Sequence, residues 1–172
     1  AILDDIQPEL FPRDTALIES QARLMVLDEV IAAVVRATGL PLEILFLAAY
    51  LVSLLLLYAA LHAIGASLYT RRWTAAALML AFTLRHRIPK TSANSFEPYF
   101  HPRMLAFAFG ALAIAAILRR RFWLAVALVG TAATVHVTTA LWFAVLIGVA
   151  LVWLDRTFRP MGILVVACAG GL

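Results

Sequence analysis

Charged residues are scarce in this chain. Only 14% of its 172 residues are Asp, Glu, Lys or Arg, whereas 64% are hydrophobic. Soluble globular domains are roughly a quarter charged and about half apolar, and one soluble core could not bury this excess. The composition therefore predicts a protein that lies in a lipid bilayer. The net charge of +4 is small and its arginines alternate with apolar runs, so we expect no nucleic-acid partner.

Cysteine and recognised enzyme motifs are also nearly absent. The one cysteine, Cys168, lies in an apolar stretch, which excludes a disulfide within the chain and a cysteine metal site. No Walker loop, dinucleotide fingerprint, GxSxG or HExxH sequence occurs. The chain begins at Ala1 without a secretory signal and stops within an apolar run, so we expect a fragment that lacks a helix at each end.

Long apolar runs are abundant, and they predict an all-α fold, a polytopic bundle of transmembrane helices. The run from Phe122 to Leu154 is too long for one span of about 20 residues, so we expect a hairpin. Its break should fall within about three residues of His136, the centre of the run's polar cluster. The predicted spans cover about residues 44–64, 73–86, 103–118, 122–135, 138–154 and 161–172, the last one truncated.

The segment 1–39 has a different character, because it is polar and rich in turns. Asp14 is a candidate N-cap for a helix that runs to about Thr38 and ends at Gly39 and Pro41. The helix is too charged to cross lipid, and its apolar residues fall loosely on one face. We therefore predict an extracytoplasmic loop and an amphipathic interfacial helix in residues 1–39, and the transmembrane helices in residues 40–172.

The basic residues predict the orientation. If every predicted break is right, three basic clusters lie on one side of the membrane, which the positive-inside rule makes cytoplasmic. A tryptophan accompanies each cluster, as in an aromatic belt. The loop 85–103 then lies outside, together with the N-terminal segment. The cytoplasmic clusters are Arg71–Arg72, Arg119–Arg121 and Arg156/Arg159, with Trp73, Trp123 and Trp153 beside them.

The outside loop is basic where such loops usually are not, which indicates an anion site for a phosphate or pyrophosphate at the membrane face. The alternative is that Arg85 and Arg87 extend to the interface to anchor a short helix, while prolines shape the loop. The candidate residues for phosphate or lipid binding are Arg85, Arg87, Lys90, His101 and Arg103 of the loop, with His136 at the same face.

Each titratable candidate has an alternative role. Glu97 could act as a general base or pair with Arg103. His101 could ligate, donate to phosphate or cap the next helix. His136 is a functional candidate because ionisable residues inside membranes usually are, and the alternative is a neutral ring bonded to Thr134, Thr138 or a carbonyl.

Two further candidates remain from the sequence. Asp5 could be a catalytic carboxylate or a solvated cap. A divalent metal ion has suitable ligand types but no recognised ligand spacing, so no metal ligand is assigned. The residues of those types are His86, Glu97, His101 and His136.

The stretch 102–154 resembles a feature of C-type membrane-integral glycosyltransferases, the protein-mannosyltransferase-like superfold. An apolar helix meets the basic turn Arg119–Arg121, then WLAVALVG from Trp123 to Gly130, then a polar turn and a return helix. Members often have Lys-Pro or His-Pro at that turn, where this chain has His136-Val137. The segment Leu10–Asp14 is similar to the end of the first outer loop in related bacterial membrane proteins.

The resemblance implies an enzyme of the bacterial inner membrane that takes a sugar from a polyprenyl-phosphate donor at the extracytoplasmic face. A carboxylate, Glu97 or Asp5, would act as the base or orient the acceptor, and the outer basic residues would bind the donor phosphate. The alternative is a non-enzymatic membrane protein, either a transporter subunit or a flippase-like lipid binder. A transporter should have charged or Gly/Pro-broken helices near the midplane, whereas the predicted spans are nearly free of charge and the polar residues gather at one surface.

Overall fold

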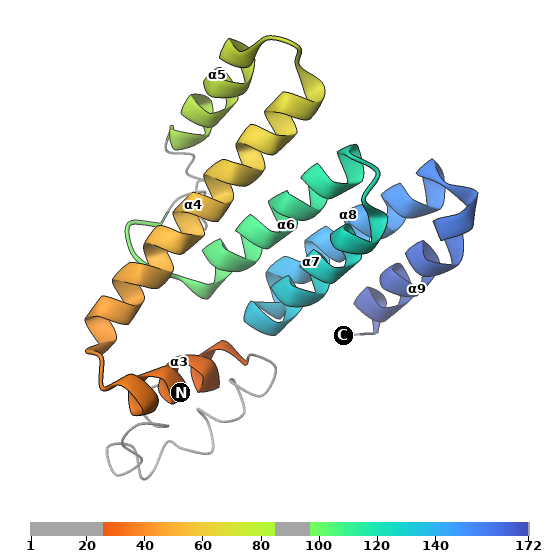
Figure 1. The fold of residues 1–172 in the computed structure, drawn as a ribbon. Helices are drawn as coiled ribbons and strands as arrows, with labels where there is room; N and C mark the ends of the chain where they lie inside the picture. The colour runs from red at the N-terminus through yellow and green to blue at the C-terminus, as the bar shows by residue number, and fades with distance from the viewer. Residues whose placement is uncertain (1–25, 85–96, 172) are drawn as a thin grey trace, which may run out of the picture.

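The computed structural model describes residues 26–84 and 97–171, and each regular element among them is a helix (Figure 1). The predicted all-α class is thus confirmed. In chain order the elements are α3 (Leu27–Thr38), α4 (Leu42–Leu68), α5 (Arg72–Thr83), α6 (Pro102–Leu118), α7 (Phe122–Val135), α8 (Val137–Leu154), the 3₁₀ turn η2 (Arg156–Phe158) and α9 (Arg159–Gly170).

Two of these helices, α4 and α8, are long and apolar enough to cross a membrane, and α6 and α7 are shorter apolar helices. The expected break in the long apolar run is present, because α7 ends at Val135 and α8 begins at Val137. The other ends differ from the expected bounds by a few residues. Helix α4 is longer than expected at both ends, and α5 stops at Thr83.

Helix α3 is amphipathic, as expected, and it ends at Gly39 in the left-handed conformation that favours glycine, with φ of 66°. It begins beside the end of α7, where the Val26 amide donates to the Thr134 carbonyl at 3.0 Å. Ile31 and Ala32 are its buried residues. The earlier part of the predicted helix, from Asp14, lies outside the described residues.

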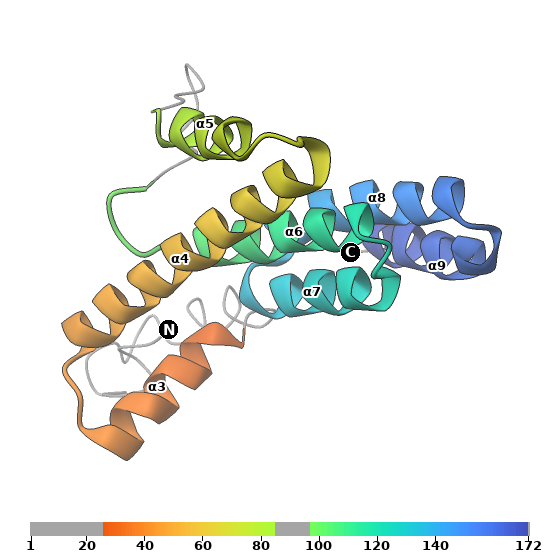
Figure 2. The same ribbon diagram turned by 45° about the horizontal axis from the view of Figure 1, so that its top comes forward.

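From α4 to α9 the helices alternate in direction, so that helices consecutive in the chain are antiparallel (Figures 1 and 2). Helix α6 is the central one, because it packs against α4, α7 and α8. Its buried residues are mostly alanines, and small residues let helix backbones approach closely in a membrane. A Cβ at Gly110 would come within 2.2–2.4 Å of the Phe143 ring, so this glycine sets the approach of α6 to α8.

The alternation gives the bundle two ends. We call the arginine end the one at which α4, α6 and α8 finish. There Arg119 Nε of α6 donates to Ser67 Oγ of α4 at 3.3 Å, and the Phe122 and Phe158 rings have centroids 4.7 Å apart. The arginines at this end are Arg71, Arg72, Arg119, Arg120, Arg121, Arg156 and Arg159.

We call the opposite end the histidine end, because His101 precedes α6 there and His136 precedes α8. The Phe46 ring of α4 stacks on Phe100, which lies just before α6, with centroids 5.9 Å apart. Helix α3 lies at the same end (Figure 1). The fold therefore brings the starts of α6 and α8 together, far from the arginine end.

Candidate functional site

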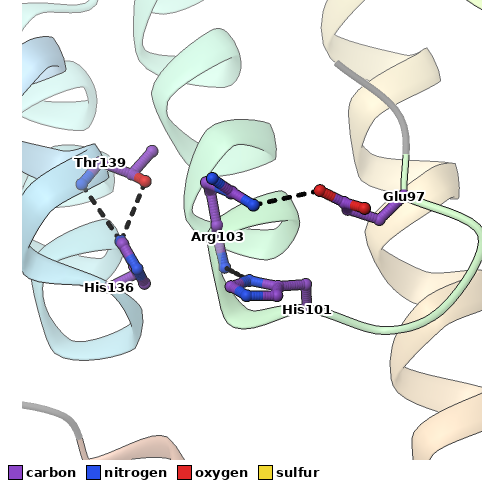
Figure 3. Close-up of polar contacts among 5 residues, drawn as sticks. All are labelled: Glu97, His101, Arg103, His136 and Thr139. Atoms are coloured by element: carbon purple, nitrogen blue, oxygen red, sulfur yellow. Dashed lines mark hydrogen bonds and ion pairs between the residues drawn. The ribbon is translucent and has the colours of Figure 1, made fainter. Parts of the chain in front are cut away.

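The polar cluster at the histidine end is built on two helix N-termini (Figure 3). His101 is the N-cap of α6, and its Nδ1 accepts the Arg103 backbone N–H at 3.1 Å. Pro102 follows at the first helical position, where its missing N–H costs nothing. Of the three roles considered for His101, the structure therefore shows that of a helix cap.

His136 has the same part at the start of α8. Its Nδ1 accepts the Thr139 backbone N–H at 3.2 Å and lies 3.0 Å from the Thr139 hydroxyl oxygen. The alternative to a functional role was a neutral His136 ring that bonds a threonine or a carbonyl. The ring does bond a threonine, but this residue is Thr139 and not Thr134 or Thr138. Thr139 is buried, and it stands three residues after the cap, where an N-cap side chain normally finds its N–H donor.

The two caps fix the tautomer of both rings. A nitrogen that accepts a backbone N–H carries no proton of its own, so the neutral ring has its proton on Nε2. The centroids of His101 and His136 are 6.2 Å apart and the ring planes are inclined by 58°. Two imidazole N–H donors therefore lie close together at the end of the bundle, on two different helices.

Both rings favour the neutral form. Burial lowers the pKa of His101 below its ordinary value of 6.5, and the charge of Arg103 lowers it further, while Glu97 opposes the shift. Burial also lowers the pKa of His136, followed by the nearby His101 and Arg103. The cause is the same in each case, since a cation is poorly solvated in this place and stands beside other positive groups.

Glu97 and Arg103 form an ion pair across the same site, with Arg103 NH2 and Glu97 Oε1 3.1 Å apart. The Glu97 side chain is 5% exposed and that of Arg103 is 35% exposed. The pairing considered as the alternative role of Glu97 is thus present. Because the guanidinium has five N–H groups, this contact leaves Arg103 donors for a further partner.

The remaining sequence candidates cannot be placed. Asp5, Arg85, His86, Arg87 and Lys90 lie outside the described residues. Within residues 26–84 and 97–171, no three His, Cys, Asp or Glu side chains come close enough together to hold a metal ion. His101 and His136 supply two such ligands, which is fewer than a zinc site needs.

Sequence reasoning missed two features of this end. The first is Thr139, whose spacing from His136 matches a helix cap. The second is a half-open groove of about 260 Å³ among α7, α8 and α9, which begins beside His136. No sequence signal for the groove existed, because it depends on how three helices pack.

Comparison of the chain with models of protein families, with curated proteins and with solved structures found no match.

Proposed function

We propose that this chain is part of a polytopic membrane protein that binds the phosphate of a lipid at the histidine end. The observation that carries the proposal is the approach of His101 to His136, with ring centroids 6.2 Å apart. Both rings are oriented through Nδ1, which directs the protons to Nε2. With Arg103 they form a group of donors suited to an oxyanion.

The surroundings favour an anion for a second reason. The starts of α6 and α8 meet here, and helix N-termini carry partial positive charge. The apolar helices that follow favour lipid as the surrounding solvent, so the anion would sit near the membrane surface. A lipid phosphate would use both the anion-binding donors and the apolar surroundings, whereas a soluble phosphate would use only the donors.

The chemistry that we propose beyond binding is glycosyl transfer from a polyprenyl-phosphate sugar. Its support here is that the Glu97 carboxylate lies beside Arg103, next to the proposed phosphate site. The ion pair favours a positioning role for Glu97, because the Arg103 guanidinium already holds one of its carboxylate oxygens. If Glu97→Gln in the full-length protein abolishes sugar transfer but retains donor binding, Glu97 takes part in the reaction.

The non-enzymatic alternative shares the lipid site and differs in lacking turnover. A transport pathway finds little support in the described helices. The buried Ser53 of α4 donates to the Ala49 carbonyl of its own helix, so this polar group needs no passing solute. Charged side chains in the described helices lie toward the two ends of the bundle.

The test of phosphate binding is His101→Asn and His136→Asn in phosphatidylcholine nanodiscs. Asparagine is itself a good N-cap, so the helix start is retained while the imidazole Nε2–H is lost. Losing one charge-assisted contact, worth about 1.5–3 kcal/mol, should weaken binding about tenfold to a hundredfold. The probe is hexadecyl phosphate, with hexadecanol as the uncharged comparison.

Alanine at the same two positions is the matched control, because it removes both the cap and the donor. We expect His101→Ala and His136→Ala to lower thermal stability as well as binding, and the asparagine variants to lower binding alone. If the folded asparagine variants bind hexadecyl phosphate as tightly as the parent, the two histidines are caps only and the proposal is wrong.

A further inference from the structure

We infer that the groove among α7, α8 and α9 holds the hydrocarbon chain of the lipid whose phosphate the histidine end binds. The inference rests on the proposed phosphate site and adds the path of the chain. The groove has a volume of about 260 Å³ and almost entirely apolar walls. An apolar cavity of that size does not hold ordered water, so its natural occupant is itself apolar.

The groove begins at the cluster that would hold the phosphate. Val137, the residue after His136, lines it, and so does Ala133, two residues before the end of α7. The chain of a lipid whose phosphate is held by the histidines would therefore enter the groove past Val137. A lipid phosphate has a charged group at one end and hydrocarbon along the rest, which matches the donors at the histidine end and the apolar groove. We therefore infer that the occupant of the groove is a lipid.

The walls run along the helices toward the middle of the bundle. The lining residues of α7 lie between Val126 and Ala133, seven steps along the helix, which at a rise of 1.5 Å per residue is about 10 Å. This is a length that suits part of an extended chain, and the volume is below that of pockets for whole drug-sized ligands. The walls include Val126, Gly130, Ala133, Ala140, Val165 and Cys168.

Gly130 offers a way to fill the groove without disturbing the packing. A Cβ at this position would meet nothing within 4 Å, so Gly130→Leu places its side chain in open space. Gly170 is the matched control, since a Cβ there also meets nothing and Gly170 does not line the groove. Both substitutions replace a helical glycine with the same residue, so they differ in the groove alone.

The experiment uses the full chain in phosphatidylcholine nanodiscs and hexadecyl phosphate with a diazirine in the middle of the chain. Hexadecanol with the same diazirine is the uncharged comparison. After photolysis, mass spectrometry maps the labelled peptides. We expect phosphate-dependent labelling on α7 and α9, including the Cys168 peptide, which excess unlabelled hexadecyl phosphate should abolish. Gly130→Leu should lose this labelling and Gly170→Leu should keep it.

A second measurement uses Cys168, the one cysteine of the chain, which is exposed and lines the groove. Hexadecyl phosphate should slow its reaction with N-ethylmaleimide several-fold, and hexadecanol should not. The protection should disappear in Gly130→Leu. It should also disappear in the His101→Asn/His136→Asn double variant, because the phosphate is no longer held.

The outcomes separate the two proposals. Phosphate-dependent labelling that falls on α4 or α5, or that persists unchanged in Gly130→Leu, overturns the groove and leaves the phosphate site standing. Equal labelling by the phosphate and the alcohol overturns both. A groove that neither probe labels is covered by another helix or a second copy, and this outcome also overturns the inference.

Discussion

The two ends of the bundle treat charge in opposite ways. Within the described residues, the arginine end has seven arginines against one acidic residue, Asp155, whose carboxylate accepts the Thr157 amide at 2.8 Å. The histidine end has two arginines against four acidic residues, counting α3 and the start of α4. The arginine end therefore has a large excess of cations, whereas at the histidine end Arg103 is paired with Glu97.

Three of the four tryptophans strengthen this contrast, and the fourth, Trp142, is 72% exposed in the first half of α8. Trp73, Trp123 and Trp153 are 86%, 72% and 84% exposed, and all three lie at the arginine end. Exposed tryptophan beside arginine is typical of a membrane–water interface. The difference between the ends supports our proposals that the arginines orient the chain and that the histidine end is a binding site.

The largest expected effect is on accessibility, which should be all or none. In a Cys168→Ala background, Arg156→Cys should be protected from an impermeant thiol reagent in intact cells, because the arginine end is predicted to be cytoplasmic. Tyr99→Cys should react, since Tyr99 is 59% exposed and lies at the histidine end. Labelling of Arg156→Cys with protection of Tyr99→Cys would reverse the orientation.

Several features of this arrangement followed from the sequence. The break at His136 was predictable because the apolar run exceeds one bilayer span. The cap by His101 and the pairing of Glu97 with Arg103 were among the alternatives considered, because each joins residues close in the chain. The end of α3 at Gly39 followed from ordinary helix-stop chemistry.

The hairpin argument placed His101 and His136 at the same membrane face, but the approach of their ring centroids to 6.2 Å required tertiary information. It depends on the close approach of α6 and α8, which Gly110 permits by leaving space for the Phe143 ring. Nothing local to either histidine specifies that contact. The groove depends in the same way on the placement of α7 and α9 around α8. Short-range pairing is thus readable from sequence, whereas contacts between distant helices are not.

The next effect in size is on stability and concerns the unequal burial of the ion pair. Arg103→Gln leaves the 5% exposed Glu97 carboxylate without this cation. We expect a loss of about 1–3 kcal/mol, below the cost of breaking a fully buried pair because Arg103 is partly solvated. Glu97→Gln should cost less, since the 35% exposed Arg103 retains water.

Thermal unfolding in detergent measures both losses, and the Glu97→Gln/Arg103→Gln double variant is the control. If the carboxylate is the cause, the double variant should be more stable than Arg103→Gln alone. Equal losses in the two single variants would show that the pair is held in water-like surroundings. The histidine end would then resemble the arginine end more than the burial indicates.

A smaller effect is expected from pH. The pKa values of His101 and His136 are lowered by burial, so the unfolded chain binds protons that the folded chain does not. The stability that depends on the two neutral rings is fully present above pH 6.5, the ordinary pKa of histidine. It is lost as the pH falls below this value. The midpoint of thermal unfolding should therefore fall as the pH drops below 6.5, and the His101→Asn/His136→Asn variant should lose this dependence.

A bound phosphate should oppose that trend. An anion beside the rings raises their pKa values, so hexadecyl phosphate should bind more tightly as the pH falls through the same range. Stability without the ligand and affinity for it are then expected to move in opposite directions. A monoalkyl phosphate itself gains a proton at about pH 6, so the parent is compared with the His101→Asn/His136→Asn variant, and an equal pH dependence of affinity in both would mean that the rings act only as caps.

The smallest effect concerns Arg120 at the arginine end. Its φ of 55° lies in the left-handed region, which costs an ordinary side chain about 1 kcal/mol and suits glycine or asparagine. Arg120→Asn should therefore raise stability by about 0.5–1 kcal/mol. An arginine in a conformation that it does not favour makes sense if its charge serves orientation.

Reducing the cluster to one arginine, by combining Arg120→Asn with Arg119→Gln, should then increase the fraction of chains whose Arg156→Cys is labelled from outside. If stability rises and orientation is unchanged, Arg120 contributes no measurable orientation and the contrast between the two ends depends on the other arginines.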